Sequence, residues 1–298
     1  MENPKNREHT MNLDNYQQLI QKDFPDFKIQ DLKYLGSGWD NAAVLVNGDY
    51  VFRFLRGIFD KNYPLKTEDV QKEVNILNYL QGKTSFAAPK PDFVAPDASY
   101  FGYKLIPGTL WDQAPDHLSD EYLQSWVATR SEISKVIGKS EAVNLKVPNY
   151  GTDKNEALAR AYIADPSADP RVVQMAQAAM DYVCTRCEPK DSWAFIHEDL
   201  QLSNCMVDTV AKKITGVIDW MEAEVGPVEA EFYFWSKYGK EVLHKVAALQ
   251  QEYDGTVIDP KLARCIHQFY IVADYQDFKT RGFSEAADHK WRQIEAYL

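Results

Sequence analysis

Early in the chain, apolar residues fall in short runs separated by turn-forming residues, a pattern typical of strands. Residues 43–46 and 50–55 are two such runs, and Asn47-Gly48 between them favours a tight hairpin turn. A shorter run at 33–35 precedes them. The pattern therefore predicts a small antiparallel sheet near the start of the chain.

Elsewhere, apolar residues recur every three or four positions, which is the spacing of a helix with one buried face. This spacing predicts a first helix around Tyr16 and Ile20 and a second running from Val70 to Leu80. Beyond Gly108 it predicts mainly helices, over residues 118–137, 156–163, 172–186, 228–248, 260–279 and 285–297. These elements together indicate an α+β fold.

The chain divides where the strand-rich part gives way to the helical part. Residues 100–108 form an apolar run ending in Pro107-Gly108, as expected of a strand that leads into a connector. We expect a loose tail over residues 1–12, a smaller lobe with the sheet over 13–104, and a larger, mostly helical lobe over 105–298.

A pair of opposite charges is expected inside the smaller lobe. Arg53 lies in an otherwise apolar strand, and Glu73 falls within the apolar face of the following helix. A charge that faces inward needs a partner, so we expect these two side chains to meet. The alternative is that Arg53 extends to solvent and Glu73 is partly exposed.

The most informative motif lies close to residue 200. It consists of His197-Glu198-Asp199, Asn204 and, after an apolar segment, Ile218-Asp219-Trp220. Metal-assisted phosphoryl transfer needs a carboxylate to orient a hydroxyl, and an amide and a second carboxylate to hold Mg²⁺. Flanking apolar runs predict strands that bring these side chains to one edge of a small sheet. A hairpin with incidental acids is the alternative.

A second motif, Gly36-Ser37-Gly38, lies between the first two expected strands. Glycines at alternate positions allow a turn whose N–H groups can approach phosphate. The Gly-Lys-Ser/Thr ending of a P-loop is missing, so this is a different kind of loop, or a simple turn.

Taken together, these motifs resemble the aminoglycoside and macrolide phosphotransferase family, relatives of choline kinases with a two-lobed, protein-kinase-like fold. The resemblance runs from about residue 35 to about residue 235. Residues 36–41 are similar to certain aminoglycoside 2''-phosphotransferases, whereas residues 218–225 are similar to macrolide 2'-phosphotransferases. The sub-family therefore stays open.

The resemblance implies a role for each motif residue. Asp199 would orient the acceptor hydroxyl as the catalytic residue, and Asn204 and Asp219 would bind Mg²⁺. The nucleotide, ATP or GTP, would be held by the glycine loop, by the cation on the strand with its acid partner, and by the connector. The connector would bind the purine through its backbone. The residues of these three elements are Gly36, Ser37, Gly38, Arg53, Glu73, Tyr103 and Ile106.

The expected function is Mg²⁺-dependent transfer of the nucleotide γ-phosphate to a hydroxyl of a small molecule, most simply a macrolide or aminoglycoside antibiotic. Two alternatives are a kinase of a metabolite such as choline or an amino-sugar, and a catalytically silent nucleotide-binding regulator. Glu198 stands where the family has Gly, and Glu229 or Glu231 replaces a family Asp. The Leu-His pair of the family is not evident in residues 127–136.

Charge and hydropathy narrow the range of partners. A formal net charge of −11 argues against nucleic acid, because phosphate backbones call for basic surface. No stretch approaches the apolar length of a membrane span, and residues 1–12 are polar rather than signal-like. We expect a cytoplasmic protein, a monomer or weak dimer, whose partners are a nucleoside triphosphate and a small acceptor and not a membrane.

The four cysteines are Cys184, Cys187, Cys205 and Cys265. The first two have the spacing of half a zinc site, but no second close pair accompanies them. We expect all four to be reduced thiols with a structural role.

Overall fold

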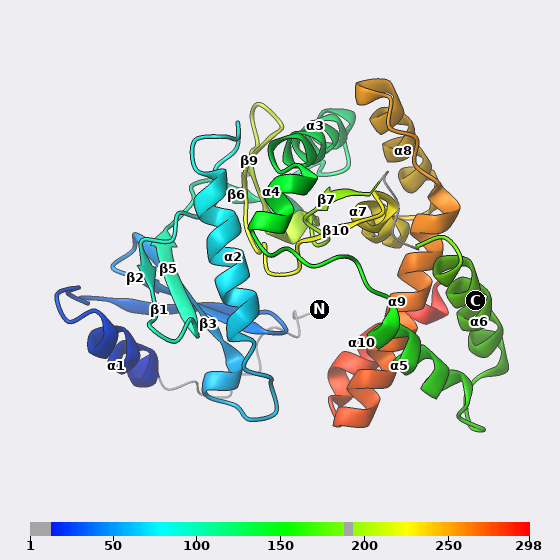
Figure 1. Ribbon diagram of the computed structural model, residues 1–298, viewed down its shortest axis with the longest axis horizontal. Helices are drawn as coiled ribbons and strands as arrows, with labels where there is room; N and C mark the ends of the chain where they lie inside the picture. Colours follow the sequence, from blue (N-terminus) through cyan, green and yellow to red (C-terminus); the bar gives the residue numbers. More distant parts are fainter. Residues whose placement is uncertain (1–12, 188–192) are drawn as a thin grey trace. The chain divides into compact units, whose positions relative to one another are not determined.

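The structure is a computed structural model that describes residues 13–187 and 193–298 (Figure 1). The chain forms two compact units. The first runs up to Ala114 and also contains Ser203–Val210 and Ile214–Glu222; the second consists of Pro115–Leu202, Ala211–Lys213 and Ala223–Leu298. The expected tail over residues 1–12 lies outside the described residues, and the division into lobes at residue 104 stays a prediction.

The first unit contains a five-stranded antiparallel sheet with the strand order β1-β2-β3-β5-β4 (Figure 1). The strands are β1 Leu32–Ser37, β2 Asn41–Val46, β3 Tyr50–Leu55, β4 Phe93–Val94 and β5 Tyr100–Lys104. Three residues connect β2 to β3, and the first two of them, Asn47 and Gly48, have positive φ of 56° and 68°, as a tight hairpin turn favours. The predicted hairpin is therefore confirmed.

From residue 13 onward, the α-helices of the first unit are α1 Leu13–Asp23 and α2 Thr67–Leu80. Tyr16 and Ile20 of α1 pack into an aromatic cluster with Phe52 and Phe54 of the sheet. Gly102 lies opposite Phe52, and a Cβ there would meet the Phe52 ring at 2.6 Å. Glycine at this position thus makes room for the ring.

A second, three-stranded sheet has the order β6-β8-β9. Its strands are β6 Thr109–Leu110, β8 Cys205–Asp208 and β9 Lys213–Val217, so the predicted hairpin after residue 204 is confirmed. The apolar run before the motif behaves differently from expectation. It forms β7 Ala194–Ile196, which pairs with β10 Glu224–Gly226 in the second unit instead of joining this sheet.

The second unit is mainly helical, as predicted. Its helices are α3 Asp120–Val136, α4 Lys139–Asn144, α5 Asp153–Ile163, α6 Pro170–Cys184, α7 Glu229–Phe232, α8 Lys240–Asp254, α9 Pro260–Arg281 and α10 Ser284–Glu295. Helix α9 packs against α5, α6 and α10 (Figure 1). The single helix expected over residues 228–248 is wrong, because Gly239, with φ of 100°, separates α8 from the 3₁₀ segment Tyr233–Tyr238.

The fold class predicted from the sequence, α+β with antiparallel sheets and a helical part, is confirmed. Within the described residues, no helix combines the length and the apolar character needed to cross a membrane. None of the four cysteines is joined in a disulfide, and three of them are buried; their being reduced thiols with a structural role stays a prediction.

Candidate active site

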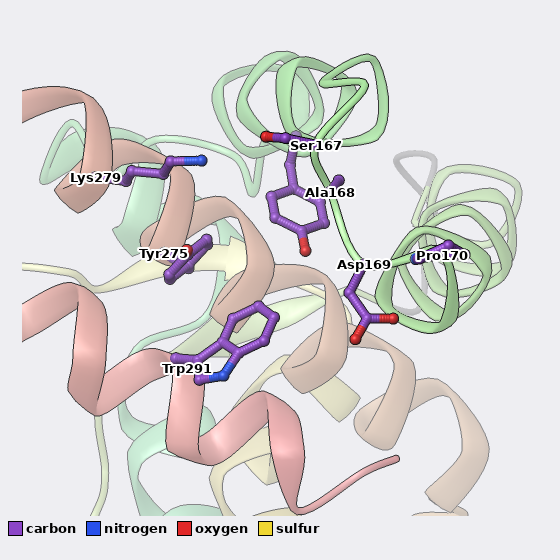
Figure 2. Close-up of a pocket in the computed structure, with 8 residues that line it drawn as sticks. Ser167, Ala168, Asp169, Pro170, Tyr275, Lys279 and Trp291 are labelled. Carbon is purple, nitrogen blue, oxygen red and sulfur yellow. The ribbon is translucent and has the colours of Figure 1, made fainter.

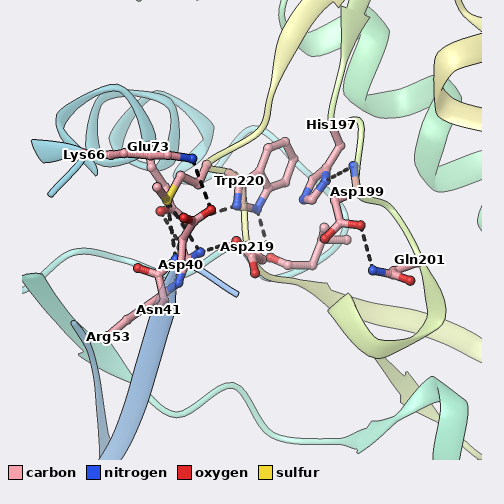
Figure 3. Close-up of polar contacts among 12 residues, drawn as sticks. Asp40, Asn41, Arg53, Lys66, Glu73, His197, Asp199, Gln201, Asp219 and Trp220 are labelled. Carbon is pink, nitrogen blue, oxygen red and sulfur yellow. Dashed lines mark hydrogen bonds and ion pairs between the residues drawn. The ribbon is translucent and has the colours of Figure 1, made fainter. Parts of the chain in front are cut away.

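Arg53 and Glu73 form a buried ion pair in the first unit. Glu73 lies on the inner face of α2 with 1% of its surface exposed, and Arg53 lies on β3 with 9% exposed. Arg53 Nη1 donates to both oxygens of the Glu73 carboxylate (Figure 3). The pairing predicted from two charges on apolar faces is therefore confirmed.

The same carboxylate also holds the loop that follows β9. The Trp220 N–H donates to Glu73 Oε1 at 2.9 Å, and Arg53 Nη2 donates to Asp219 Oδ1 (Figure 3). Burial raises the pKa of Glu73, while Arg53 and the Trp220 N–H oppose that rise. A helix, a strand and a loop thus meet at one buried acid.

Asn204 and Asp219 are the two residues expected to bind Mg²⁺, and both lie in the first unit. The Asn204 carbonyl accepts a hydrogen bond from the Ile218 N–H at 2.9 Å, so the two residues lie on adjoining segments of backbone. Asp219 has φ of 68°, and its side chain is 37% exposed. A carboxylate and an amide oxygen suit Mg²⁺, which usually takes few protein ligands and completes its shell with water and phosphate.

Across residues 13–187 and 193–298, no group of three or more His, Cys, Asp or Glu side chains is placed to hold a metal ion. The candidate Mg²⁺ ligands stay the two that the motif supplies, Asn204 and Asp219, and their role stays a prediction.

The glycine motif lies where β1 runs into the turn before β2. Gly36 and Ser37 are the last residues of β1, so the prediction that both glycines lie in the turn is right for Gly38 and wrong for Gly36. The Gly38 N–H donates to the Asn41 carbonyl at 2.8 Å, and Arg56 Nη1 donates to the Gly38 carbonyl at 3.1 Å. Gly36 has φ of 148°, and a Cβ at Gly36 or Gly38 would meet no atom within 4 Å. The turn therefore leaves open space above its backbone, with Ser37 at the end of β1 beside it.

A second cation beside this turn was not singled out in the sequence. Lys66, just before α2, pairs with Asp40 at 3.2 Å (Figure 3). Glu222 lies near both residues; burial raises the pKa of its carboxyl, and Lys66 opposes the rise. Lys66 belongs to a polar stretch without periodicity, so no sequence signal distinguishes it from an ordinary surface lysine.

Tyr103 and Ile106, expected near the purine, are both buried. Tyr103 lies on β5 opposite Val51, and Ile106 packs so closely on Gly216 that a Cβ there would meet its Cγ2 atom at 2.6 Å. Because both side chains fill the core of the first unit, their expected role with nucleotide falls to their backbone groups. That role stays a prediction.

Asp199 lies in the second unit, in the loop after β7. Gln201 Nε2 donates to Asp199 Oδ1 at 2.7 Å, and Lys237 Nζ donates to Gln201 Oε1 at 3.0 Å. The Asp199 N–H donates to His197 Nδ1 at 3.3 Å (Figure 3). The carboxylate is thus oriented by a short polar chain. The convergence of Asp199 with Asn204 and Asp219 on one ion stays a prediction.

Glu231 binds the backbone of the loop that carries Asp199. The sequence had left Glu229 and Glu231 as equal candidates to replace the family Asp. Glu231 Oε2 accepts from the His197 N–H at 2.7 Å, and the N–H groups of Glu198 and Leu200 also donate to the carboxylate. Burial raises the pKa of Glu231 to about 7, against these donors and the nearby Arg130. Glu229 accepts instead from the Asp259 N–H, at 3.3 Å.

The second unit also has a hollow of about 430 Å³ between the α5–α6 connection and helices α9 and α10 (Figure 2). Tyr162, Tyr275 and Trp291 supply aromatic walls. Its charged residues already have partners, since Asp169 accepts from the Arg171 N–H and Lys279 pairs with Asp165. The hollow contains no predicted site residue, and we do not assign it to the reaction.

Replacing Glu73 by Ala should lower the free energy of unfolding by about 3 kcal/mol, because it leaves the buried Arg53 charge and the Trp220 N–H without their shared acceptor. Glu68→Ala, an exposed acid on the same helix, is the matched control and should cost less than about 0.5 kcal/mol. Urea denaturation measures both. A loss equal to the control's would show that the carboxylate does not hold these partners.

Glu231 makes stability depend on pH. As pH rises from 4.5, the ordinary pKa of the carboxyl, to about 7, its folded-state pKa, the unfolded chain releases a proton that the folded protein keeps. The free energy of unfolding should therefore fall across this range, by roughly 3 kcal/mol at most. Denaturation at several pH values should show a shallower decrease for Glu231→Gln; equal slopes would contradict the assignment.

A model of the phosphotransferase enzyme family matches residues 31–263. Similar solved structures include the GDP and kanamycin complex of APH(2")-IIia, with a TM-score of 0.79 and 20% identity over 95% of this chain and 97% of that chain. The GDP complex of aminoglycoside 2'-phosphotransferase-IIIa has a TM-score of 0.78 and 21% identity over 96% and 98%.

Macrolide 2'-phosphotransferase type I is similar too, with a TM-score of 0.70 and 18% identity over 94% of this chain and 96% of that chain. At these identities the structures show a shared fold, which is the fold that the motifs predicted. Because the family model matches well over half of its length, this chain belongs to the phosphotransferase enzyme family.

Proposed function

We propose that this phosphotransferase transfers the γ-phosphoryl group of a nucleoside triphosphate to a hydroxyl of an aminoglycoside or macrolide. The observation that carries the proposal is the junction at Glu73, where Arg53 is held beside Asp219 and, one backbone hydrogen bond away, Asn204. A cation held beside a carboxylate that can bind Mg²⁺ is part of the arrangement that Mg²⁺-dependent phosphoryl transfer requires.

On the donor side, the chain supplies charge and shape. Arg53, held by Glu73, would face the phosphate oxygens, and the Gly36–Gly38 turn would cover them with backbone N–H groups. Mg²⁺, when held by Asn204 and Asp219, would neutralise charge that builds up on the phosphates. The relatives crystallised with GDP support guanine nucleotides as donors to test beside ATP.

On the acceptor side, Asp199 would accept a hydrogen bond from the attacking hydroxyl and align it in line with the γ-phosphate. Its hydrogen bond from Gln201 orients the carboxylate for this task. Because the transition state of phosphoryl transfer is loose, Asp199 would orient the hydroxyl more than deprotonate it.

The net charge of −11 favours a cationic acceptor such as an aminoglycoside. The kanamycin complex of a similar structure supports an aminoglycoside as the acceptor, and the similar macrolide enzyme supports a macrolide. A metabolite kinase of the same fold is the second candidate, because it would need the same residues. We place the enzyme in the cytoplasm, where nucleoside triphosphates are supplied.

The proposal is tested by phosphate transfer to aminoglycosides, macrolides, choline and amino-sugars, each with ATP and GTP. Asp199→Ala should lower kcat on the best acceptor by roughly 10² to 10⁴ and leave nucleotide affinity nearly unchanged. Asp181→Ala, an exposed acid of the same unit, should leave kcat unchanged. Transfer to choline or amino-sugars alone would favour the metabolite kinase, and an unchanged rate would remove Asp199 from the mechanism.

Asp219→Ala should abolish the gain in nucleotide affinity that Mg²⁺ provides, because the metal loses its carboxylate ligand. Calorimetry of GTP and ATP binding, with Mg²⁺ and with EDTA, measures that gain directly. Asp199→Ala is the control that should keep it. A normal Mg²⁺ effect in the Asp219 variant would place the metal elsewhere.

A further inference from the structure

Glu198 adopts a backbone conformation that non-glycine residues rarely take. Its φ is 64°, in the left-handed region, where a Cβ costs roughly 1 kcal/mol. A glycine at this position would take the same conformation without that cost. Since Glu198 precedes Asp199 directly, whatever holds Glu198 in place also acts on the residue expected to orient the acceptor.

The Glu198 side chain is tied to helix α9. Tyr270, in the middle of α9, donates its hydroxyl proton to Glu198 Oε1 at 2.9 Å. The Tyr270 and Tyr150 hydroxyls lie 2.7 Å apart, and their rings stack with centroids separated by 6.5 Å. Burial, and then the Glu198 charge, raise the pKa of both tyrosines, so both remain protonated and able to donate.

The backbone of Glu198 is tied to a different element. Its N–H donates to the Glu231 carboxylate, which also binds the N–H groups of His197 and Leu200. Glu198 is thus held through its backbone by Glu231 and through its side chain by Tyr270. Both attachments restrict rotation about the Glu198 backbone, which leads directly into Asp199.

We propose that Glu198 is a positioning residue: its hydrogen bond to Tyr270 holds the left-handed backbone that carries Asp199 and so sets the direction of the Asp199 carboxylate. A glycine needs no such tether to reach this conformation, but it also leaves the segment freer to move. The effect on turnover rests on the proposed function of Asp199, whereas the tether itself does not.

The hydrogen bond, and not the charge, is what the proposal requires. Glu198→Gln keeps an oxygen that accepts from Tyr270, whereas Glu198→Ala and Tyr270→Phe each remove the bond. We expect kcat to fall roughly tenfold in Glu198→Ala and Tyr270→Phe, with the KM for nucleotide unchanged, and to stay within about threefold in Glu198→Gln. The double variant Glu198→Ala/Tyr270→Phe should be no slower than either single variant.

Tyr275→Phe is the matched control, because it makes the same change on the same helix at a residue without contact to Glu198; its kcat should not change. Melting temperatures of all variants separate positioning from general instability. A Glu198→Gln variant as slow as Glu198→Ala would overturn the proposal, because charge would then be the property that matters. A Tyr270→Phe variant with the kcat of the unmodified protein would overturn it as well.

Amide hydrogen exchange of residues 197–200 provides a readout that needs no acceptor. The amides of Glu198 and Asp199 should exchange faster in Glu198→Ala and Tyr270→Phe, and at the original rate in Glu198→Gln and Tyr275→Phe. Unchanged exchange in the first two variants would refute the tether. Altered exchange in a protein that phosphorylates no acceptor would leave the tether standing and refute the proposed function instead.

Discussion

The first unit depends on the interactions of the buried Glu73 carboxylate. A charge placed in a protein interior is costly unless opposite charge and hydrogen-bond donors surround it. Here Arg53 provides the charge and the Trp220 N–H provides a further donor. One acid thereby fixes a helix to a strand and to the loop that carries Asp219. The positions of Arg53 and Asp219, the residues expected to meet phosphate and metal, therefore depend on this buried carboxylate.

The second unit uses a buried acid in a different way. Glu231 gathers N–H groups of the loop that carries Asp199, and the nearby Arg130 contributes opposite charge without a direct bond among the contacts described. Glu73 therefore orients side chains, whereas Glu231 shapes a backbone. In both units a buried glutamate holds the loop that carries a residue expected to take part in the reaction.

Residues whose environment is local in sequence could be predicted, and those joined over long distances could not. The Arg53–Glu73 pair was foreseeable because each charge interrupts an apolar face. The contact of Arg53 with Asp219 spans 166 positions and leaves no local pattern. Glu229 and Glu231 share one short helix, so their tertiary contacts alone separate them. The strand Glu224–Gly226 is too short for periodicity to reveal the partner of β7.

The first unit is assembled from stretches that are far apart in the chain. Its N-terminal part ends at Ala114, but β8, most of β9 and the Asp219 loop arrive only with Ser203–Val210 and Ile214–Glu222. During synthesis, Glu73 lacks the Trp220 N–H until the ribosome has released this later stretch. The sheet and α2 therefore lack one hydrogen bond to Glu73 while residues 115–202 of the second unit emerge, and a fragment cut after Ala114 would lack the segment that completes its interior.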